Sequence, residues 1–350
     1  MPKKLPPPPI AQETLRALVA AATEYAAAKP WEDMFDSQVV GLTDPVTHEV
    51  RLACVLGQAG EVFGAAIYRN TTGIHWLLTI MENEETELSL EEAVAMDSLK
   101  VEFVSKRELG KEDLNGLKEI GFKSSGKGRG WPQFRSVQPG WMPWHIDQTE
   151  AGQLLADLPR LTRFCTWARQ HPDFYDHHQE LEIPFLPSVM PDRELTEADL
   201  AWQTLKIPPL AVEPYQCGPA QLDQLRKLKS NAKLVCEYCC EIVSGGAFLE
   251  QGRPCLSRVS LLVEPVGGMV LGHKLFPSAL PFMTCAGSGL VEILIERGFV
   301  PGILRIDQPR LAAALQPLCD ELNIRLEMAK LPSLAAAKAS LERFLRFGRG

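Results

Sequence analysis

The last fifty residues constrain the fold of this chain more than any other segment, because helix and strand patterns alternate there. The pattern predicts a strand, an amphipathic helix, a second strand and a closing helix at residues 302–306, 308–323, 324–328 and 332–345. A β-α-β-α unit of this kind must lay its helices on a parallel sheet. Ligands usually bind at the carboxyl ends of such strands, where Asp307 is the only acid.

Composition sets broad limits on function. A chain of 350 residues suits two domains, and 45% hydrophobic with 23% charged residues is typical of a globular protein. The net charge of −8 and the pI near 5.5 argue against broad capture of nucleic acid or of anionic membranes. No apolar run approaches the roughly 20 residues of a membrane span. We therefore predict no membrane or nucleic-acid partner.

The cysteines indicate a reducing compartment. Their number, nine, is odd, and the proline-rich start of the chain lacks the apolar core of a signal peptide. We predict reduced, mostly buried thiols and a cytoplasmic location. Cys236, Cys239 and Cys240 contain a CxxC spacing, but a structural zinc site needs a second pair of ligands. Buried packing is the default for these three, and metal binding stays open.

The order of helices, strands and turns divides the chain into four parts. Residues 1–29 are a proline-rich lead with a helix, 30–170 an α+β domain, 171–195 a linker with four prolines, and 196–350 an α/β domain. In the first domain we expect an antiparallel meander with helices. In the second we expect a mixed sheet with a β-hairpin followed by α-β-α-β-α. The fold class is thus α/β and α+β.

A segment rich in Gly, Pro and Trp, residues 126–144, is predicted to lack regular structure. Its aromatic side chains are Trp131, Phe134, Trp141 and Trp144. Rings interleaved with prolines can form an exposed recognition surface for a protein partner. The alternative is a rigid plug over a core, since large rings supply area that a loop otherwise lacks.

Residues 121–128 nearly match the phosphate-binding loop GxxxxGK[ST]. Gly128 stands where that loop needs a Ser or Thr to hold magnesium, and a helix precedes the loop instead of a strand. We therefore predict a mobile basic loop that includes Lys123, Lys127, Arg129 and Arg135. No cofactor is expected from this segment.

Three acids suggest a catalytic alternative. The order of elements in the second domain resembles the ribonuclease H-like core of transposases and integrases, whose acids hold two metal ions for phosphoryl transfer. By that resemblance the acids are Glu264, Asp307 and Glu342, with Mg²⁺ or Mn²⁺ as cofactor. Glu264 departs from the aspartate of that core, and Glu342 lies four residues from both Lys338 and Arg346, which is typical of a solvated helix face.

The whole chain from about Trp31 also resembles an uncharacterised bacterial family of two tandem domains of unknown function. The resemblance rests on Gly60–Gly64, Trp131–Ser136, Pro139–Trp144, the hairpin Val259–Leu271 and the unit from Pro301 to Leu345. That family has no established activity, so the resemblance implies no catalytic residues. Our leading hypothesis is a cytoplasmic, non-catalytic binding or adaptor protein. The alternative is a metal-dependent, ribonuclease H-like nuclease, active or degenerate.

Overall fold

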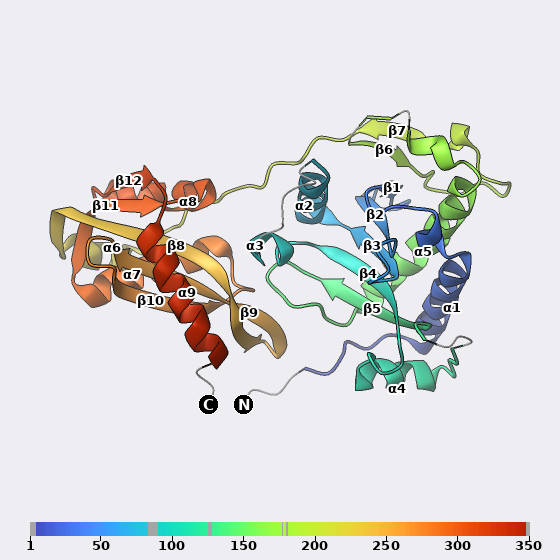
Figure 1. The fold of residues 1–350 in the computed structure, drawn as a ribbon, viewed down its shortest axis with the longest axis horizontal. Coiled ribbons are helices and arrows are strands. Elements are labelled where there is room, and N and C mark those ends of the chain that lie inside the picture. Colours follow the sequence, from blue (N-terminus) through green and yellow to red (C-terminus); the bar gives the residue numbers. More distant parts are fainter. Residues whose placement is uncertain (1–4, 83–89, 125–127, 177, 180, 348–350) are drawn as a thin grey trace. The chain divides into compact units, whose positions relative to one another are not determined.

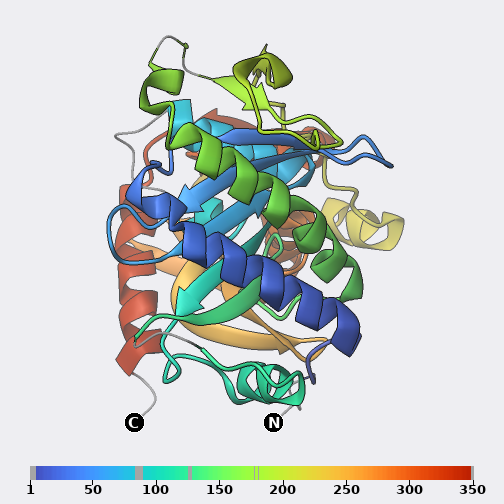
Figure 2. The ribbon, with the colours of Figure 1, turned by 90° about the vertical axis from the view of Figure 1, so that its right-hand side faces the viewer.

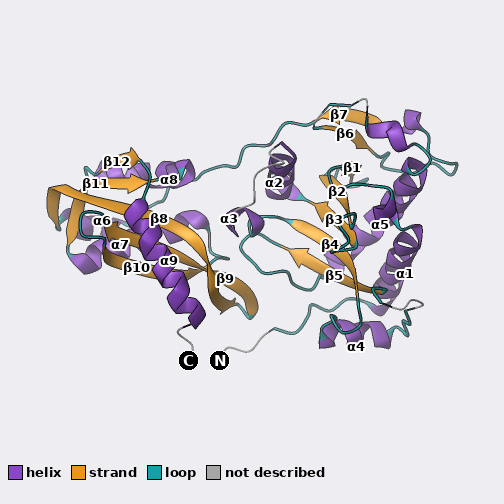
Figure 3. Cartoon of the chain, in the orientation of Figure 1, coloured by secondary structure: helices purple, strands orange, loops and turns teal. Residues whose placement is uncertain are grey.

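The chain divides into two compact units. The N-terminal unit comprises Leu5–Pro139 and Pro143–Leu210, and the C-terminal unit comprises Ala211–Gly350 with the short segment Gly140–Met142. The computed structural model describes residues 5–82, 90–124, 128–176, 178–179 and 181–347. Both units mix helices and strands (Figure 1, Figure 3), so the predicted α/β and α+β class is confirmed.

The N-terminal unit is built on one seven-stranded sheet. Its strands are β1 (Val40–Thr43), β2 (Val50–Leu56), β3 (Gly64–Tyr68), β4 (Ser98–Val104), β5 (Trp131–Val137), β6 (Glu182–Phe185) and β7 (Ala201–Thr204). They lie in the order β5-β4-β3-β2-β1-β6-β7. The first five form an antiparallel meander, and β6 joins β1 in parallel. The predicted meander is therefore correct and has two more strands than expected at its β1 edge.

Helices cover both faces of this sheet. They are α1 (Gln12–Ala28), α2 (Asn70–Glu82), α3 (Leu90–Ala93), α4 (Lys111–Glu119) and α5 (Gln148–Ala168), with 3₁₀ turns at Pro30–Glu32, Pro172–Tyr175 and Glu197–Asp199. Helices α1 and α5 lie side by side on one face (Figure 2). In β2, Ala53 and Val55 pack in that core, whereas Leu52 and Cys54 pack with Leu77 of α2. Because strand side chains alternate, β2 is buried on both faces.

The C-terminal unit is built on a five-stranded sheet. Its strands are β8 (Lys229–Glu250), β9 (Arg253–Glu264), β10 (Met269–Pro277), β11 (Phe299–Ile306) and β12 (Arg325–Met328), and its helices are α6 (Pro219–Arg226), α7 (Phe282–Arg297), α8 (Pro309–Glu321) and α9 (Pro332–Phe347). The strand order is β10-β9-β8-β11-β12. Strands β8 to β10 are antiparallel, whereas β11 is parallel to both β8 and β12.

Opposite faces of β8 contact different helices. Tyr238 belongs to the core that includes Leu290 of α7 and Leu315 of α8, and its neighbour Cys239 packs with Leu334 of α9. The helices of the β-α-β-α unit therefore lie on opposite faces of a parallel part of the sheet, and the predicted unit is confirmed.

Strand β5 corrects the expectation that residues 126–144 lack regular structure. Trp131–Val137 pairs antiparallel with β4 along its whole length. Pro132 is tolerated because β5 is an edge strand, where one side of the backbone needs no partner. Phe134 and Ser136 are buried on one face. The Gly and Pro residues flanking this strand hid its alternation.

The segment 171–195 is part of the N-terminal unit, where the sequence analysis placed a linker. Strand β6 pairs with β1 and β7, Ile183 and Phe185 are buried beside β2, and Leu195 reaches the core under α5. A four-residue strand is too short to show a clear period of two among charges and prolines. The N-terminal unit consequently extends to Leu210.

A buried ion pair joins β2 to α5. Arg51 is 1% exposed and Asp157 is 0% exposed, and the guanidinium donates to both carboxylate oxygens, at 2.7 and 3.0 Å. Asp44, after β1, accepts from the same guanidinium at 3.3 Å. Burial raises the pKa of Asp157, although Arg51 acts in the opposite direction. This pair ties the helix to the sheet by charges that have little access to water.

Asp44 is expected to make stability depend on pH. Its carboxylate accepts backbone N–H groups of Thr47 and Val46 at 2.9 Å, and these bonds, with Arg51, lower its pKa to about 2. The usual value is about 3.9. Its contribution should be complete above about pH 4 and vanish as pH falls through about 2. Urea unfolding of wild type and Asp44→Asn between about pH 2 and pH 5 should show a difference that shrinks toward low pH. A pH-independent difference would contradict this account.

Candidate functional site

The carboxyl end of β11, where the sequence predicts a ligand site, lies beside the middle of the long strand β8. Exposed Asp307 follows β11 directly, and Glu241 of β8 lies near it. Gln308 donates to Glu241 at 3.1 Å, and Lys338 of α9 forms an ion pair with the same carboxylate. Desolvation by neighbouring groups and the charge of Glu241 raise the pKa of Asp307, although Lys338 acts in the opposite direction. A lysine ammonium thus already balances one of these two negative charges.

The other two acids of the predicted triad have different surroundings. The Glu264 carboxylate accepts two backbone N–H groups, at 2.9 and 2.7 Å, in the turn between β9 and β10. The register of β9, β8 and β11 separates Glu264 from Asp307 by about 14 Å on ideal sheet spacings. Glu342 belongs to α9, but its side chain lies outside the described residues. The structure therefore does not bring Glu264 to Asp307, and the acid beside Asp307 is Glu241.

Other potential metal ligands do not converge. In the described ranges, no group of three or more His, Cys, Asp or Glu side chains could hold a metal ion. Cys236 and Cys240 pack on the α7 face of β8, whereas Cys239 packs on the α9 face. Burial raises the pKa of Cys236 to about 12 and that of Cys239 well above its usual value. These thiols act as small hydrophobic side chains.

The four aromatic residues of the predicted partner surface do not form one patch. Phe134 is 8% exposed and Trp144 is 6% exposed, so both are core residues. Trp131 is half-buried and contacts Phe122 edge-on, with ring centroids 5.6 Å apart. Trp141 groups with the C-terminal unit, where its ring lies 4.7 Å from the Arg253 guanidinium. Contact with a protein partner therefore stays a prediction for the two half-buried rings, Trp131 and Trp141.

The predicted basic loop has its arginines engaged within the N-terminal unit. Arg135 donates to both carboxylate oxygens of Asp113, at 2.9 and 2.6 Å, and Arg129 contacts the carbonyl of Glu61. Lys127 lies outside the described residues. These contacts leave the loop poorly suited to binding an anion.

Helix α5 begins at an N-cap, Asp147. Asp147 accepts the N–H of Glu150 at 2.8 Å, and Glu150 accepts the N–H of Asp147 at 3.1 Å. This capping box fixes the start of a helix that runs for 21 residues. Its carboxyl-terminal half carries side chains toward a cavity.

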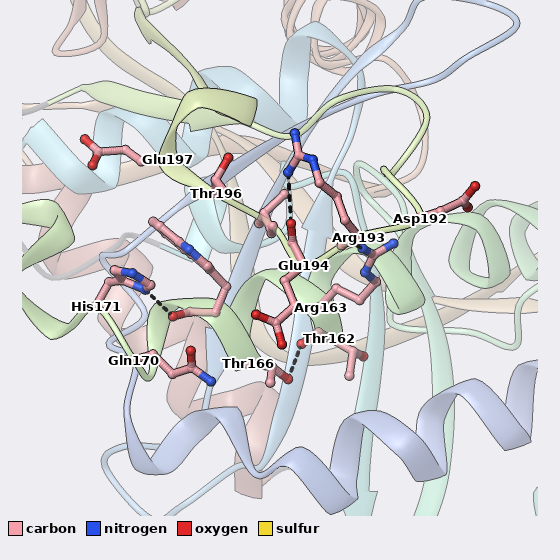
Figure 4. A pocket seen from close by; sticks show the side chains of 12 residues that line it. Thr162, Arg163, Thr166, Gln170, His171, Asp192, Arg193, Glu194, Thr196 and Glu197 are labelled. Carbon is pink, nitrogen blue, oxygen red and sulfur yellow. Dashed lines mark hydrogen bonds between the residues drawn. The ribbon is translucent and has the colours of Figure 1, made fainter.

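A cavity of about 750 Å³ lies beside that half of α5 (Figure 4). Residues four apart, on α5 and in the turn after it, line one wall in two neighbouring rows. The rows are Thr162, Thr166 and Gln170, and Arg163, Trp167 and His171. Residues 192–197 form the opposite wall. Trp167 and Leu195 are buried and provide an apolar floor. We call this cavity the α5 pocket.

Hydrogen bonds hold the rim of the α5 pocket. Arg163 donates to the carbonyls of Pro191 and Arg193, at 2.7 Å each. The Arg193 guanidinium in turn binds both carboxylate oxygens of Asp199 at 2.7 Å, and Asp199 also accepts from Thr196. The bonds from Arg193 and Thr196 lower the pKa of Asp199. These hydrogen bonds hold the rim through groups of the chain itself.

One acid points into the α5 pocket. In Figure 4 the carboxylate of Glu194 points toward Thr166 and Gln170, whereas Asp192 and Glu197 point away. None of the described side chains donates a hydrogen bond to the Glu194 carboxylate. This group is thus free to meet a ligand.

A histidine also lines the α5 pocket. The Nδ1 of His171 lies 2.9 Å from the Trp167 carbonyl, and the two rings stack with centroids 4.3 Å apart and planes at 20°. Because a carbonyl can only accept, Nδ1 carries a proton, and Nε2 is the acceptor in the neutral form of this imidazole.

Sequence reasoning missed both Glu241 and the α5 pocket. Glu241 sits in a strand among cysteines, and only the sheet register brings it to Asp307. The pocket walls come from a helix and from a segment read as a linker, and no known motif links them. The polar row at i, i+4 spacing on α5 is the one signal that marks this face.

Comparison with protein families supports the tandem organisation. A family described as Domain of unknown function (DUF7309) matches residues 16–185, and another, Domain of unknown function (DUF6930), matches residues 221–342. None of the curated proteins or solved structures matches the chain, so the ribonuclease H-like resemblance stays a prediction. Over the described ranges, no helix combines the length and apolar character needed to cross a membrane. The chain thus carries two tandem domains of unknown function, as its resemblance predicts.

Proposed function

We propose that this protein is a non-catalytic binding protein of the cytoplasm and that the α5 pocket is its ligand site. The observation that carries the proposal is a pocket with an ordered rim, an apolar floor and convergent polar side chains. Its volume of about 750 Å³ lies within the range of roughly 300–1,000 Å³ typical of ligand sites. The free cysteines are consistent with a reducing compartment.

The hydrogen bonds in the pocket favour binding over catalysis. A hydroxyl nucleophile needs a base within hydrogen-bond reach. Here the Thr166 hydroxyl donates to the carbonyl of Thr162 at 2.9 Å, and His171 Nδ1 donates to the carbonyl of Trp167. Both protons are directed to the helix backbone, and no described contact links the hydroxyl to the imidazole.

Filling the pocket tests the proposal. Thr166 is exposed at the pocket wall, so Thr166→Trp should fill space without disturbing the core. In a thermal-melt screen of metabolites and short peptides, a ligand at 100 times its Kd should stabilise wild type by about 2.7 kcal/mol, and this gain should disappear in Thr166→Trp. Thr149→Trp, also exposed but near the start of α5, is the control. A ligand that stabilises both variants equally would place the site elsewhere.

The second candidate, metal-dependent phosphoryl transfer, is favoured only by the proximity of Asp307 and Glu241. Two carboxylates, one of them paired with Lys338, do not fit a two-metal site. We expect Mn²⁺ to leave the melting temperature of wild type unchanged. Lys338→Met should instead gain about 1.4 kcal/mol at ten times the Kd of the metal, because it releases both acids.

Thermal melts with Mn²⁺ and Mg²⁺ check this expectation. Asp307→Asn in the Lys338→Met background should remove the gain. A metal-dependent rise in wild type that Asp307→Asn abolishes would instead favour the enzyme.

A further inference from the structure

We infer that the α5 pocket recognises a positively charged nitrogen, the ammonium of a lysine or the guanidinium of an arginine carried by a peptide segment. This inference rests on the proposed function and names its ligand class. Three features of the pocket support this ligand class: the hydrogen bonds of its arginines, the polar groups that face its centre, and its volume.

The cationic side chains of the pocket are occupied by its own rim. Arg163 donates to two backbone carbonyls, and Arg193 is bound to Asp199 through two hydrogen bonds. Glu194, in contrast, has a charged group that is not engaged in the rim. Its carboxylate points into the pocket (Figure 4) and receives no hydrogen bond from the described side chains. A carboxylate without a described side-chain donor thus faces the pocket, and its negative charge favours a cation.

The remaining polar atoms are mainly acceptors. The hydroxyls of Thr162 and Thr166 donate to the helix carbonyls of Leu158 and Thr162, at 2.8 and 2.9 Å, so their oxygen lone pairs stay available. His171 adds the Nε2 acceptor. An ammonium offers three donors and no acceptor, and a guanidinium offers five donors. Such a ligand matches this set, whereas a phosphate or carboxylate would face Glu194 with like charge.

Size and apolar surface point to a peptide side chain and its neighbours. The buried Trp167 and Leu195 offer a floor for the methylene stem of lysine or arginine, whose charged head then reaches Glu194. A cavity of about 750 Å³ exceeds one side chain, so flanking backbone also fits. The walls are largely exposed, hence we expect a transient, salt-sensitive complex.

The test compares two peptides and two variants of the full chain. The probes are a capped alanine–lysine–alanine tripeptide and the same peptide with its lysine acetylated, which keeps the stem and removes the charge. We expect titration calorimetry to show binding of the first by wild type and not of the second. Glu194→Gln should weaken binding roughly tenfold. Glu24→Gln, at an exposed acid of α1 that does not line the pocket, should leave binding unchanged.

Failure of this inference can be told apart from failure of the proposed function. Equal affinity for both peptides, equal weakening by both variants, or no binding of the lysine peptide at millimolar concentration would overturn the cation preference. If a capped alanine–glutamate–alanine peptide binds instead and Thr166→Trp abolishes its binding, the pocket is a ligand site but not for cations. A lysine peptide that Thr166→Trp still binds fully would contradict both.

Discussion

Replacing Arg51 with methionine is expected to lower the free energy of unfolding of the N-terminal unit by about 3–5 kcal/mol. Methionine keeps much of the apolar stem but leaves Asp157, which is 0% exposed, without its two hydrogen bonds. A buried carboxylate left with the more distant Arg160 guanidinium, 3.5 Å away, must either stay charged at high cost or take up a proton. For a unit of this size the melting temperature should fall by roughly 10 °C.

Arg16→Met is the matched control for this prediction. Arg16 is exposed on α1, and within the described part of the chain its one hydrogen-bond partner is Gln12, at 3.3 Å. Its replacement should therefore change stability by less than about 0.5 kcal/mol. Urea unfolding monitored by circular dichroism measures both variants. An Arg51→Met protein as stable as Arg16→Met would show that the buried ion pair contributes nothing to the fold.

Gly64→Ala in β3 is expected to destabilise the sheet by about 3 kcal/mol. A Cβ at this position would lie 1.9 Å from the carbonyl oxygen of Val101 in β4. Gly64 and Val101 both lie in the paired part of β3 and β4, so neither backbone can move away without breaking hydrogen bonds between the two strands. The carbonyl of Gly64 also accepts the Tyr25 hydroxyl at 2.9 Å, which ties the same strand to α1.

Gly152→Ala serves as the control for that substitution. Gly152 lies inside α5, and a Cβ there would meet no atom within 4 Å. Alanine should therefore stabilise the helix by roughly 0.5–1 kcal/mol. Thermal melts of the two variants should shift in opposite directions. A lower melting temperature for both variants would contradict the expected gain in helix stability at Gly152.

Local periodicity predicted those parts of the fold that local sequence determines. The β-α-β-α unit at the carboxyl terminus has apolar spacings that change cleanly from strand to helix, and the parallel-sheet rule then sets its arrangement. The capping box at Asp147 is equally local. Strands β5 and β6 were missed because Pro132 and Pro184 suggest loops, although edge or short strands tolerate proline.

The sites depend on residues far apart in the sequence, and local patterns do not reveal them. Glu241 was overlooked because only the pairing of β8 with β11 places it beside Asp307. Glu264 was chosen for its position at a strand end, yet the register points that end away from Asp307. The α5 pocket needs both Glu194 and Thr166, which belong to segments that the sequence analysis assigned to different parts of the chain.

The central claim is that this protein binds a ligand in the α5 pocket and leaves it chemically unchanged. Equilibrium dialysis of wild type and Thr166→Trp against one cytoplasmic extract, with mass spectrometry of the retained small molecules and peptides, tests it most directly. The account predicts compounds that are enriched by wild type, absent with the variant, and recovered with unaltered mass. Identical retention by both proteins, or conversion of a retained compound into product, would contradict it.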